Sequence, residues 1–319
     1  MQTWLREEKG PFANLVEYIR MLCGPWLALL LPLTVYYWRD ISKTQRALSV
    51  SAILFHASTY LATGTNKGLF DLLLIIPSVM LAAHFSGRYR VRFEKKIVAI
   101  VLVSLLSAFA IWFFTKGQYN RPGHPGVIPI VYSKLGMQAD VSNPFIRYIP
   151  GELKYGLIAL SNYLTQGYYG LYLSLEQPFV ASYGIGHSAF LLRNVATLTG
   201  TPSLMDRPYP FRIEPYGWHP FINWHTIYPW LASDVSFPGT IIIVFFIGRL
   251  AAAAWLDSIR GANPFALGAL AQFVIMLFYF PANNQTLQTG EAWMSFWGLL
   301  LLWKTTRRKI VFGQVRRGL

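Results

Sequence analysis

The chain has 319 residues, of which 54% are hydrophobic and only 13% are charged, whereas a soluble domain carries about 25% charged residues. This composition, with apolar runs long enough to cross about 30 Å of hydrocarbon, argues against a soluble enzyme and predicts an integral membrane protein. A net charge of +14 would suit a nucleic-acid-binding protein, but the distribution of that charge along the chain argues against one.

The apolar runs predict an all-α polytopic membrane protein with about seven transmembrane helices. In chain order they lie near 21–38, 47–62, 68–86, 96–115, 236–256, 264–281 and 291–304. Residues 1–115 then hold an N-terminal segment and four helices, 116–235 form one large loop, and 236–319 hold three helices and a basic tail. For residues 1–20 two interpretations stay open: further helices precede them, or they form an amphipathic helix on the outer surface.

Basic residues predict the orientation of these helices. Lys and Arg are concentrated in the connections 39–46 and 87–96 and in the tail 304–317. With seven helices, all three fall on one side, which the positive-inside rule makes cytoplasmic. The basic excess is therefore a topology signal, and the loop 116–235 is expected outside the cytoplasm. Within that loop, the tyrosine-rich segment 151–175 predicts an amphipathic helix at the outer interface rather than a full span.

Residues 208–230 contain eight aromatic side chains. Trp and Tyr favour the membrane–water interface, and this preference explains part of the pattern. Aromatic faces beside hydrogen-bonding side chains also suit sugars, which present flat C–H faces edged with hydroxyl groups. Trp218 and Trp224 are therefore candidate substrate-binding residues, and Asn283 and Asn284 in the last outer loop are candidates for sugar hydroxyl groups. The alternative for the two asparagines is an ordinary polar turn.

Four of the six histidines lie in the large loop. The six-residue spacing of His219 and His225 matches no compact zinc motif, so no metal site is predicted. A general base is the stronger hypothesis, with His225, His219, His187 and Asp234 as candidate catalytic residues. A buried structural histidine stays the alternative for each.

Arginine binds phosphate through two parallel N–H donors. Arg193, Arg207 and Arg212 are therefore candidates for holding a lipid pyrophosphate, the alternative being contact with lipid headgroups. We expect Arg207, Arg212, His219, His225 and Asp234 to converge near the outer membrane boundary, with Arg193 and His187 reaching the same cavity. The two charges predicted within spans, Asp71 and Arg249, fit structural roles at helix ends.

Three segments together resemble a known family. They are "YLTQGYYGLYLSLEQPFVASYGIGHS" at 163–188, "NWHTIYPWLASDVSFPG" at 223–239, and the following helix "TIIIVFFIGRLAAAAW". A Tyr- and Gly-rich segment in a large periplasmic loop, followed by an Asp-x-x-x-x-Gly step into a helix, resembles Wzy-type O-antigen and exopolysaccharide polymerases and the related O-antigen ligases. Here that step runs from Asp234 to Gly239. The likeness covers about residues 60–305, and it departs from the family in showing seven helices where members usually have ten or more.

The resemblance implies a membrane glycosyltransferase of the cell inner (cytoplasmic) membrane. It would polymerise undecaprenyl-pyrophosphate-linked oligosaccharide repeat units into a surface or exported polysaccharide at the periplasmic face, without a cofactor, metal or nucleotide sugar. The implied partners are the lipid-linked oligosaccharide, the bilayer, and a flippase and chain-length regulator of the same pathway, but not nucleic acid. Two alternatives stay open: a transporter or flippase, and a non-catalytic membrane subunit of a polysaccharide-export system.

Overall fold

The computed structural model describes residues 11–62, 65, 67–88, 93–119, 131–132, 137–138, 140, 142–261 and 263–315. The longer helices are α1 (Pro11–Tyr36), α2 (Lys43–Ala62), α3 (Lys67–Phe85), α4 (Phe93–Tyr119), α6 (Gly151–Leu175), α7 (Ala189–Thr199), α9 (Ile227–Arg260), α10 (Pro264–Tyr279) and α11 (Gly290–Val315). The short ones are α5 (Pro144–Arg147), α8 (Tyr209–Arg212) and the 3-10 turns η2 (Pro202–Asp206) and η3 (Glu214–Tyr216). The strands β1 (Val131–Tyr132) and β2 (Met137–Gln138) form one antiparallel pair.

A helix covers all or nearly all of each of the seven ranges predicted to span, so the helical fold class is confirmed. Within the described residues, three helices are long and apolar enough to cross a membrane, with candidate spans at Glu17–Tyr36, Lys67–Phe85 and Ile227–Arg260. The apolar helix α10 has only 16 residues. A membrane protein is therefore indicated, and the count of seven spans stays a prediction.

Two details differ from the sequence-based expectation. The predicted helix at 236–256 begins where expected, directly after a break at Ser236, but an additional short helix at 227–235 precedes it within α9. Residues 1–20 had two open interpretations, preceding helices or an amphipathic surface helix. Residues 11–20 belong to the continuous helix α1, and residues 1–10 lie outside the described residues. The amphipathic segment 151–175 is helical over that same range as α6, but its place at the interface is not tested.

The chain divides into two compact units, and each is described by itself. Unit 1 comprises Met1–Ile53, Leu74–Arg90 and Gly167–Leu319, and unit 2 comprises Leu54–Leu73 and Val91–Gln166. The boundary within α6 falls inside the predicted large loop. That loop therefore contributes its first part to unit 2 and its second part to unit 1.

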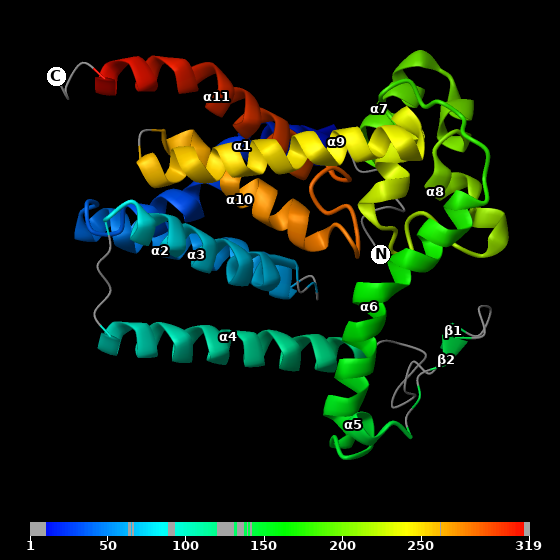
Figure 1. Cartoon of the computed structure of the whole chain (residues 1–319), viewed down its shortest axis with the longest axis horizontal. Coiled ribbons are helices and arrows are strands. Elements are labelled where there is room, and N and C mark those ends of the chain that lie inside the picture. The colour runs from blue at the N-terminus through cyan, green and yellow to red at the C-terminus, as the bar shows by residue number, and fades with distance from the viewer. Residues whose placement is uncertain are drawn as a thin grey trace. The chain divides into compact units, whose positions relative to one another are not determined.

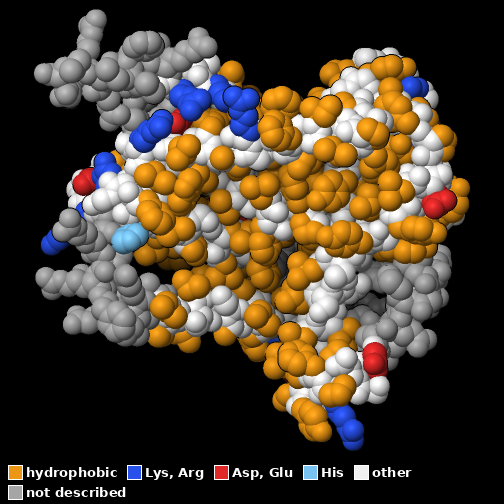
Figure 2. Space-filling model, in the orientation of Figure 1, with side chains coloured by type: hydrophobic (Ala, Val, Ile, Leu, Met, Phe, Trp, Pro, Cys, Tyr) orange, Lys and Arg blue, Asp and Glu red, His pale blue; other side chains and the backbone are white. Residues whose placement is uncertain are grey.

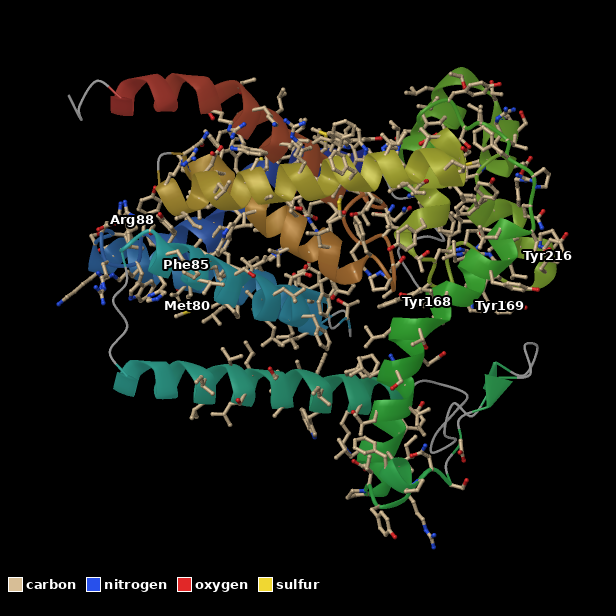
Figure 3. The ribbon with its side chains drawn as sticks, viewed as in Figure 1. Met80, Phe85, Arg88, Tyr168, Tyr169 and Tyr216 are labelled. Carbon is tan, nitrogen blue, oxygen red and sulfur yellow. The ribbon has the colours of Figure 1, made fainter. Side chains whose placement is uncertain are left out.

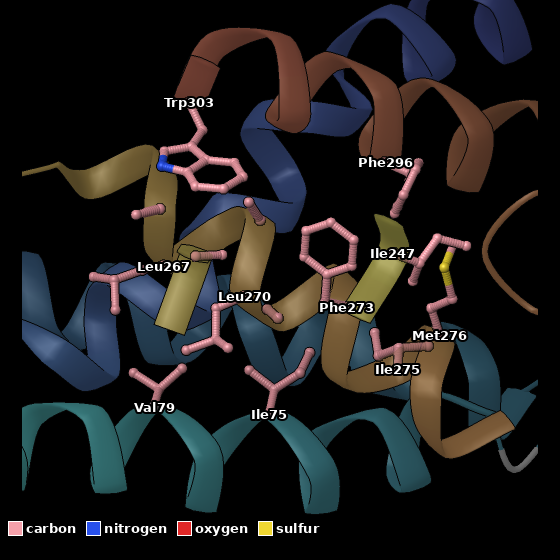
Figure 4. Packing of buried hydrophobic residues seen from close by; sticks show 14 of the residues in the cluster. Ile75, Val79, Ile247, Leu267, Leu270, Phe273, Ile275, Met276, Phe296 and Trp303 are labelled. Carbon is pink, nitrogen blue, oxygen red and sulfur yellow. The ribbon is translucent and has the colours of Figure 1, made fainter. Parts of the chain in front are cut away.

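Unit 1 is a helical bundle built around α10 (Figure 1), which packs against α1, α9 and α11. Apolar side chains occupy α10 all round, and a helix of this composition must be buried on every face. Leu267, Leu270 and Phe273 are among its buried residues. They meet Ile75 and Val79 from the second half of α3, as Figure 4 shows.

Unit 2 contains the small core between α4 and the first part of α6. Phe114 packs edge-to-face on Tyr163, with a ring separation of 5.4 Å, and Tyr155 donates its hydroxyl proton to the carbonyl of Gln118. Asp71 lies four residues after Lys67 and forms an ion pair with it. The predicted structural role of Asp71 fits this contact.

The middle of α9 carries exposed apolar side chains. Ile241, Phe245 and Phe246 are 73%, 66% and 50% exposed, and Figure 2 shows hydrophobic side chains spread along the visible surface of this helix. Exposing this apolar surface to water would be unfavourable, and an exposed apolar area of this kind marks contact with a membrane or another protein. The long apolar span of α9 favours the membrane.

Candidate functional site

Helix α9 is broken near its start. Ser236 has φ 64° and ψ 169°, a conformation that a residue with a side chain adopts at a cost of about 1–3 kcal/mol. The break separates a short helix at 227–235 from the long apolar helix that follows. Because Pro238 has no backbone N–H to satisfy, it suits the first turn of that second helix. Asp234 therefore lies at the end of the short helix, two residues before the break.

The carboxylate of Asp234 is the centre of a polar cluster in unit 1. One oxygen accepts the backbone N–H of Gly186 at 2.8 Å, and the other accepts the backbone N–H of His187 at 2.9 Å. The second oxygen also lies 3.1 Å from the Nδ1 atom of His187. The side chains of Asp234 and His187 are 9% and 17% exposed. Two candidates 47 residues apart in the sequence are thus joined by two direct contacts, and the Gly186 N–H adds a third bond to the same carboxylate.

The segment 281–289 closes this cluster from a second side. Asn284 donates from its amide to the carbonyl of His187 at 3.0 Å, and Gln288 accepts the backbone N–H of Ala189 at 3.0 Å. The Ser188 hydroxyl donates to the carbonyl of Leu287. The segment 281–289 and the turn before α7, which includes His187, are therefore held together.

Four polar atoms in this region are buried without a hydrogen-bond partner among the described residues. They are Ser182 Oγ, His187 Nε2, Asn284 Oδ1 and Thr286 Oγ1. Burying a polar atom without a partner costs about 1–3 kcal/mol. A group of such atoms beside an oriented His–Asp pair is the pattern expected of a site that binds a polar ligand.

Gly186 allows the turn 182–188 to approach α9. A Cβ atom at this position would lie 2.6 Å from the Cβ of Ser182 and 2.8 Å from that of Ser233, distances that packed atoms do not reach. The backbone of Ser182 also donates to the carbonyl of Ser233 at 2.9 Å. The small side chains at these three positions bring the two backbone N–H groups within reach of Asp234.

Two predicted phosphate-binding arginines hold the segment before this turn. Arg207 donates from Nε to the carbonyl of Ala181 at 2.6 Å, and its guanidinium lies 4.5 Å from the ring centre of Tyr183. Arg212 donates from Nη1 to the carbonyl of Pro178 at 2.6 Å. These contacts give both arginines a structural role. Phosphate binding by their remaining N–H groups stays a prediction.

His225 is in a different environment from His187. It is 1% exposed, and its ring lies 6.4 Å from that of Trp218 and 6.0 Å from that of Trp230. Its Nε2 atom lies 3.5 Å from the carbonyl of His219, and its Nδ1 has no partner among the described residues. Burial lowers the pKa of His225 from 6.5 to about 3, so the ring is neutral at physiological pH. This histidine is enclosed in an aromatic core.

The aromatic core includes one of the two predicted sugar-binding tryptophans. Trp218 is 1% exposed and donates from its indole N–H to the carbonyl of Trp224 at 3.1 Å. Its ring lies 5.3 Å from that of Tyr169 on α6 (Figure 3). A buried ring offers no face to a sugar, so Trp218 supports the loop and does not stack on a ligand as the structure stands.

The other predicted residues are dispersed. His219 is partly exposed, with Nε2 3.2 Å from Glu214, and Arg193 bonds its own helix at the carbonyl of Ala189. Trp224 and Asn283 are partly buried. The predicted single convergence is therefore divided: Asp234, His187 and Asn284 form one cluster, and His225, Trp218 and His219 belong to another.

A groove in unit 1 lies next to the Asp234 cluster along α9. It has a volume of about 340 Å³ and is lined by Leu171 and Leu175 of α6 and by Tyr228, Phe237, Thr240, Ile241 and Val244 of α9. Phe237 is three residues from Asp234, and its ring lies 5.0 Å from that of Tyr209. The groove is apolar, and one wall belongs to a helix long enough to span a membrane.

Sequence reasoning missed some residues that shape this site. Gln288 and Ser188 hold the loops around His187, and Gly186 permits the close approach. A Gly-x-Gly-His-Ser run at 184–188 before a helix was the available signal, because such runs provide backbone N–H donors. The Ser236 break had no clear signal, since Pro238 and Gly239 also fit a simple helix start.

The described residues contain no group of three or more His, Cys, Asp or Glu side chains placed as metal ligands would be. The arrangement can do acid–base chemistry with His187 and Asp234, next to an apolar groove. This chain matches no protein-family model, no curated protein and no solved structure.

Proposed function

We propose that this protein is a membrane glycosyltransferase of the Wzy type, which joins undecaprenyl-pyrophosphate-linked oligosaccharide repeat units into a polysaccharide. The reaction would take place at the periplasmic face of the cytoplasmic membrane, with seven helices spanning it. The observation that carries the proposal is the His187–Asp234 pair, located at the start of the apolar helix α9. It supports proton transfer at the depth where a lipid pyrophosphate must lie.

The hydrogen bond between the pair assigns a role to each atom. In the neutral imidazole one nitrogen carries the proton, and a carboxylate beside Nδ1 favours the proton there. Asp234 accepts that proton's hydrogen bond at 3.1 Å, which leaves the lone pair of Nε2 available. His187 then acts as the general base through Nε2, and Asp234 is a positioning residue that also fixes the backbone of His187.

The reaction balances with these groups alone. A sugar hydroxyl oxygen of the acceptor repeat unit forms a bond to the anomeric carbon of the donor. The bond from that carbon to the pyrophosphate oxygen breaks, the pyrophosphate leaves with the electron pair, and the hydroxyl proton moves to Nε2 of His187. Because Nε2 is buried, the acceptor reaches it only after one of the covering loop segments moves.

The apolar groove supports a lipid-linked substrate. Its volume of about 340 Å³ lies within the usual range for small-ligand sites, and its walls are almost entirely hydrocarbon. A chain of isoprene units fits such a lining, whereas a free sugar does not. The groove lining includes Phe237, three residues from Asp234, so one substrate would extend from the groove to the His187–Asp234 pair.

The test is polymerisation of a lipid-linked repeat unit by the purified full-length protein in vesicles, read as glycan length. His187→Asn and Asp234→Asn are expected to lower the rate by about 10²–10⁴, the usual contribution of a positioned acid or base. His84→Asn and Asp206→Asn are matched controls, because both side chains are exposed and lie outside the cluster. Wild-type glycan length in His187→Asn at equal protein amount would refute the assignment of the base.

The two arginines that hold the 178–183 segment give a further test. If either contacts the pyrophosphate, Arg212→Lys is expected to slow the reaction by on the order of 10²-fold, because an ammonium lacks the planar fork. If Arg212 serves only to bond the Pro178 carbonyl, lysine supplies that single donor and the rate stays within a few-fold of wild type. Thermal stability measured in parallel separates the two roles.

A further inference from the structure

A buried carboxylate joins the C-terminal end of α9 to the middle of α11. Asp257 is 5% exposed and accepts the indole N–H of Trp303 at 2.9 Å and Nε of Arg307 at 2.6 Å. Arg260 lies 3.8 Å away on the same helix. One carboxylate thus balances the nearest arginine, and it fixes the position of α11 against α9.

Two more cations lie at this junction. Lys304 and Arg249 are near enough for their charges to act on one another, and Lys304 also feels the charge of Arg307. Lys304 and Arg249 are both exposed. Arg260, Lys304 and Arg307 act on the negative charge of Asp257, and Arg249 acts on Lys304. These five side chains together carry a local excess of +3.

These four cationic side chains need a partner of opposite charge. Like charges brought together repel, and the repulsion is strong where part of the surroundings is not water. A positive-inside bias explains basic residues in loops, but these side chains converge from two helices separated in sequence by all of α10. Figure 2 shows Lys and Arg side chains together over the ends of these helices, with one acidic side chain among them.

Apolar side chains adjoin the cations on α9. Phe245 lies four residues before Arg249 and Leu256 seven residues after it, spacings that place all three on one face of a helix. Phe245 and Leu256 are 66% and 51% exposed. An anion bound at Arg249 would therefore meet hydrocarbon surface beside it. This combination distinguishes a lipid from a free phosphate ion, which would gain nothing from the apolar face.

We infer that Arg249 and Lys304, supported by Arg260 and Arg307, bind the phosphate of an anionic phospholipid, whose acyl chains lie along the exposed face of α9. The site is at the opposite end of α9 from His187. It does not depend on the proposed glycosyl transfer.

The experiment is native mass spectrometry of the full-length protein purified in detergent, titrated with phosphatidylglycerol or with zwitterionic phosphatidylcholine. Wild type is expected to retain phosphatidylglycerol preferentially. Arg249→Gln with Lys304→Gln is expected to weaken that binding about 10–30-fold, since each basic residue near an anionic lipid contributes about 1 kcal/mol. Neither residue bonds Asp257 in the structure, so the α9–α11 junction stays intact in this variant.

Two controls keep the result interpretable. Arg147→Gln with Lys154→Gln removes two positive charges from unit 2 and is expected to leave binding unchanged. Arg249→Lys with Lys304→Arg keeps both charges and is expected to keep binding within a few-fold. Equal retention of the two lipids by wild type, an equal loss in the unit 2 variant, or full competition by glycerol phosphate would each overturn the proposal.

Discussion

The burial of His225 predicts how stability depends on pH. An unfolded histidine has a pKa of about 6.5, and burial lowers the pKa of His225 in the folded chain to about 3. The unfolded state therefore binds a proton between these values while the folded state does not. The contribution of this residue to the free energy of unfolding is complete above pH 6.5 and is lost progressively as the pH falls toward 3.

The size of the effect follows from the difference in pKa. At pH 4.5, two units below the unfolded value, His225 alone lowers the free energy of unfolding by about 2.7 kcal/mol, since one pH unit corresponds to about 1.36 kcal/mol. The loss reaches about 4 kcal/mol at pH 3, where half of the folded molecules also carry the proton. At roughly 2–4 °C per kcal/mol, the change at pH 4.5 lowers the melting temperature by about 5–10 °C.

The assay compares melting temperatures at pH 7.5 and 4.5 for wild type and His225→Phe in the same detergent. Phe fills the aromatic cage around Trp218 and Trp230 but cannot take up a proton. Its melting temperature is expected to fall by about 5–10 °C less than that of wild type over this interval. His84→Asn removes an exposed histidine and is expected to behave as wild type. An equal pH-dependent loss in His225→Phe would show that His225 protonates freely in the folded protein.

Two further predictions concern topology and packing. In a Cys23→Ser background, a cysteine that replaces Thr199 is expected to react with an impermeant reagent added outside the cell. A cysteine that replaces Thr305 is expected to react only after the membrane is permeabilised. The reverse pattern would show that the predicted orientation is inverted. Gly186→Ala is expected to lower the free energy of unfolding by about 1–3 kcal/mol through overlap with α9. The control Gly248→Ala, whose new methyl group meets nothing within 4 Å, is expected to change it by less than about 1 kcal/mol. Similar melting temperatures for the two variants would contradict the close approach at Gly186.

The helices could be predicted from the sequence because their signals are local. The helix predicted from the tyrosine-rich segment matches the full extent of α6, from Gly151 to Leu175. The apolar runs predicted both ends of α3 and α10 to within two residues. The short helix at 227–235, before the break in α9, was not predicted because it includes Trp230 and Asp234, which resemble an interfacial loop. Tertiary contacts, and not the local apolar pattern, make these residues helical.

The site could be predicted only as a set of candidates. His187 and His225 look equivalent in the sequence, each near aromatic residues in the same loop. Burial distinguishes them, and burial depends on what packs against each ring. His187 meets Asp234 because Gly186 lets two segments approach, while His225 is enclosed by Trp218 and Trp230. Spacing along the chain carries no information on either contact.

The two carboxylates of α9 relate its structure to a bilayer. Asp234 lies just before the break at Ser236, and Asp257 lies near the other end of the helix. The 21 residues from Ser236 to Asp257 span about 32 Å at 1.5 Å per residue, close to the roughly 30 Å of hydrocarbon in a membrane. Each carboxylate is neutralised by fixed donors, backbone N–H groups and His187 at one end, Trp303 and Arg307 at the other. The exposed side chains between them are largely apolar, and the one cation there, Arg249, is within reach of the basic end. Because the carboxylates of α9 lie at two positions separated by about the thickness of the hydrocarbon layer, the helix is suited to hold one polar site at each membrane surface.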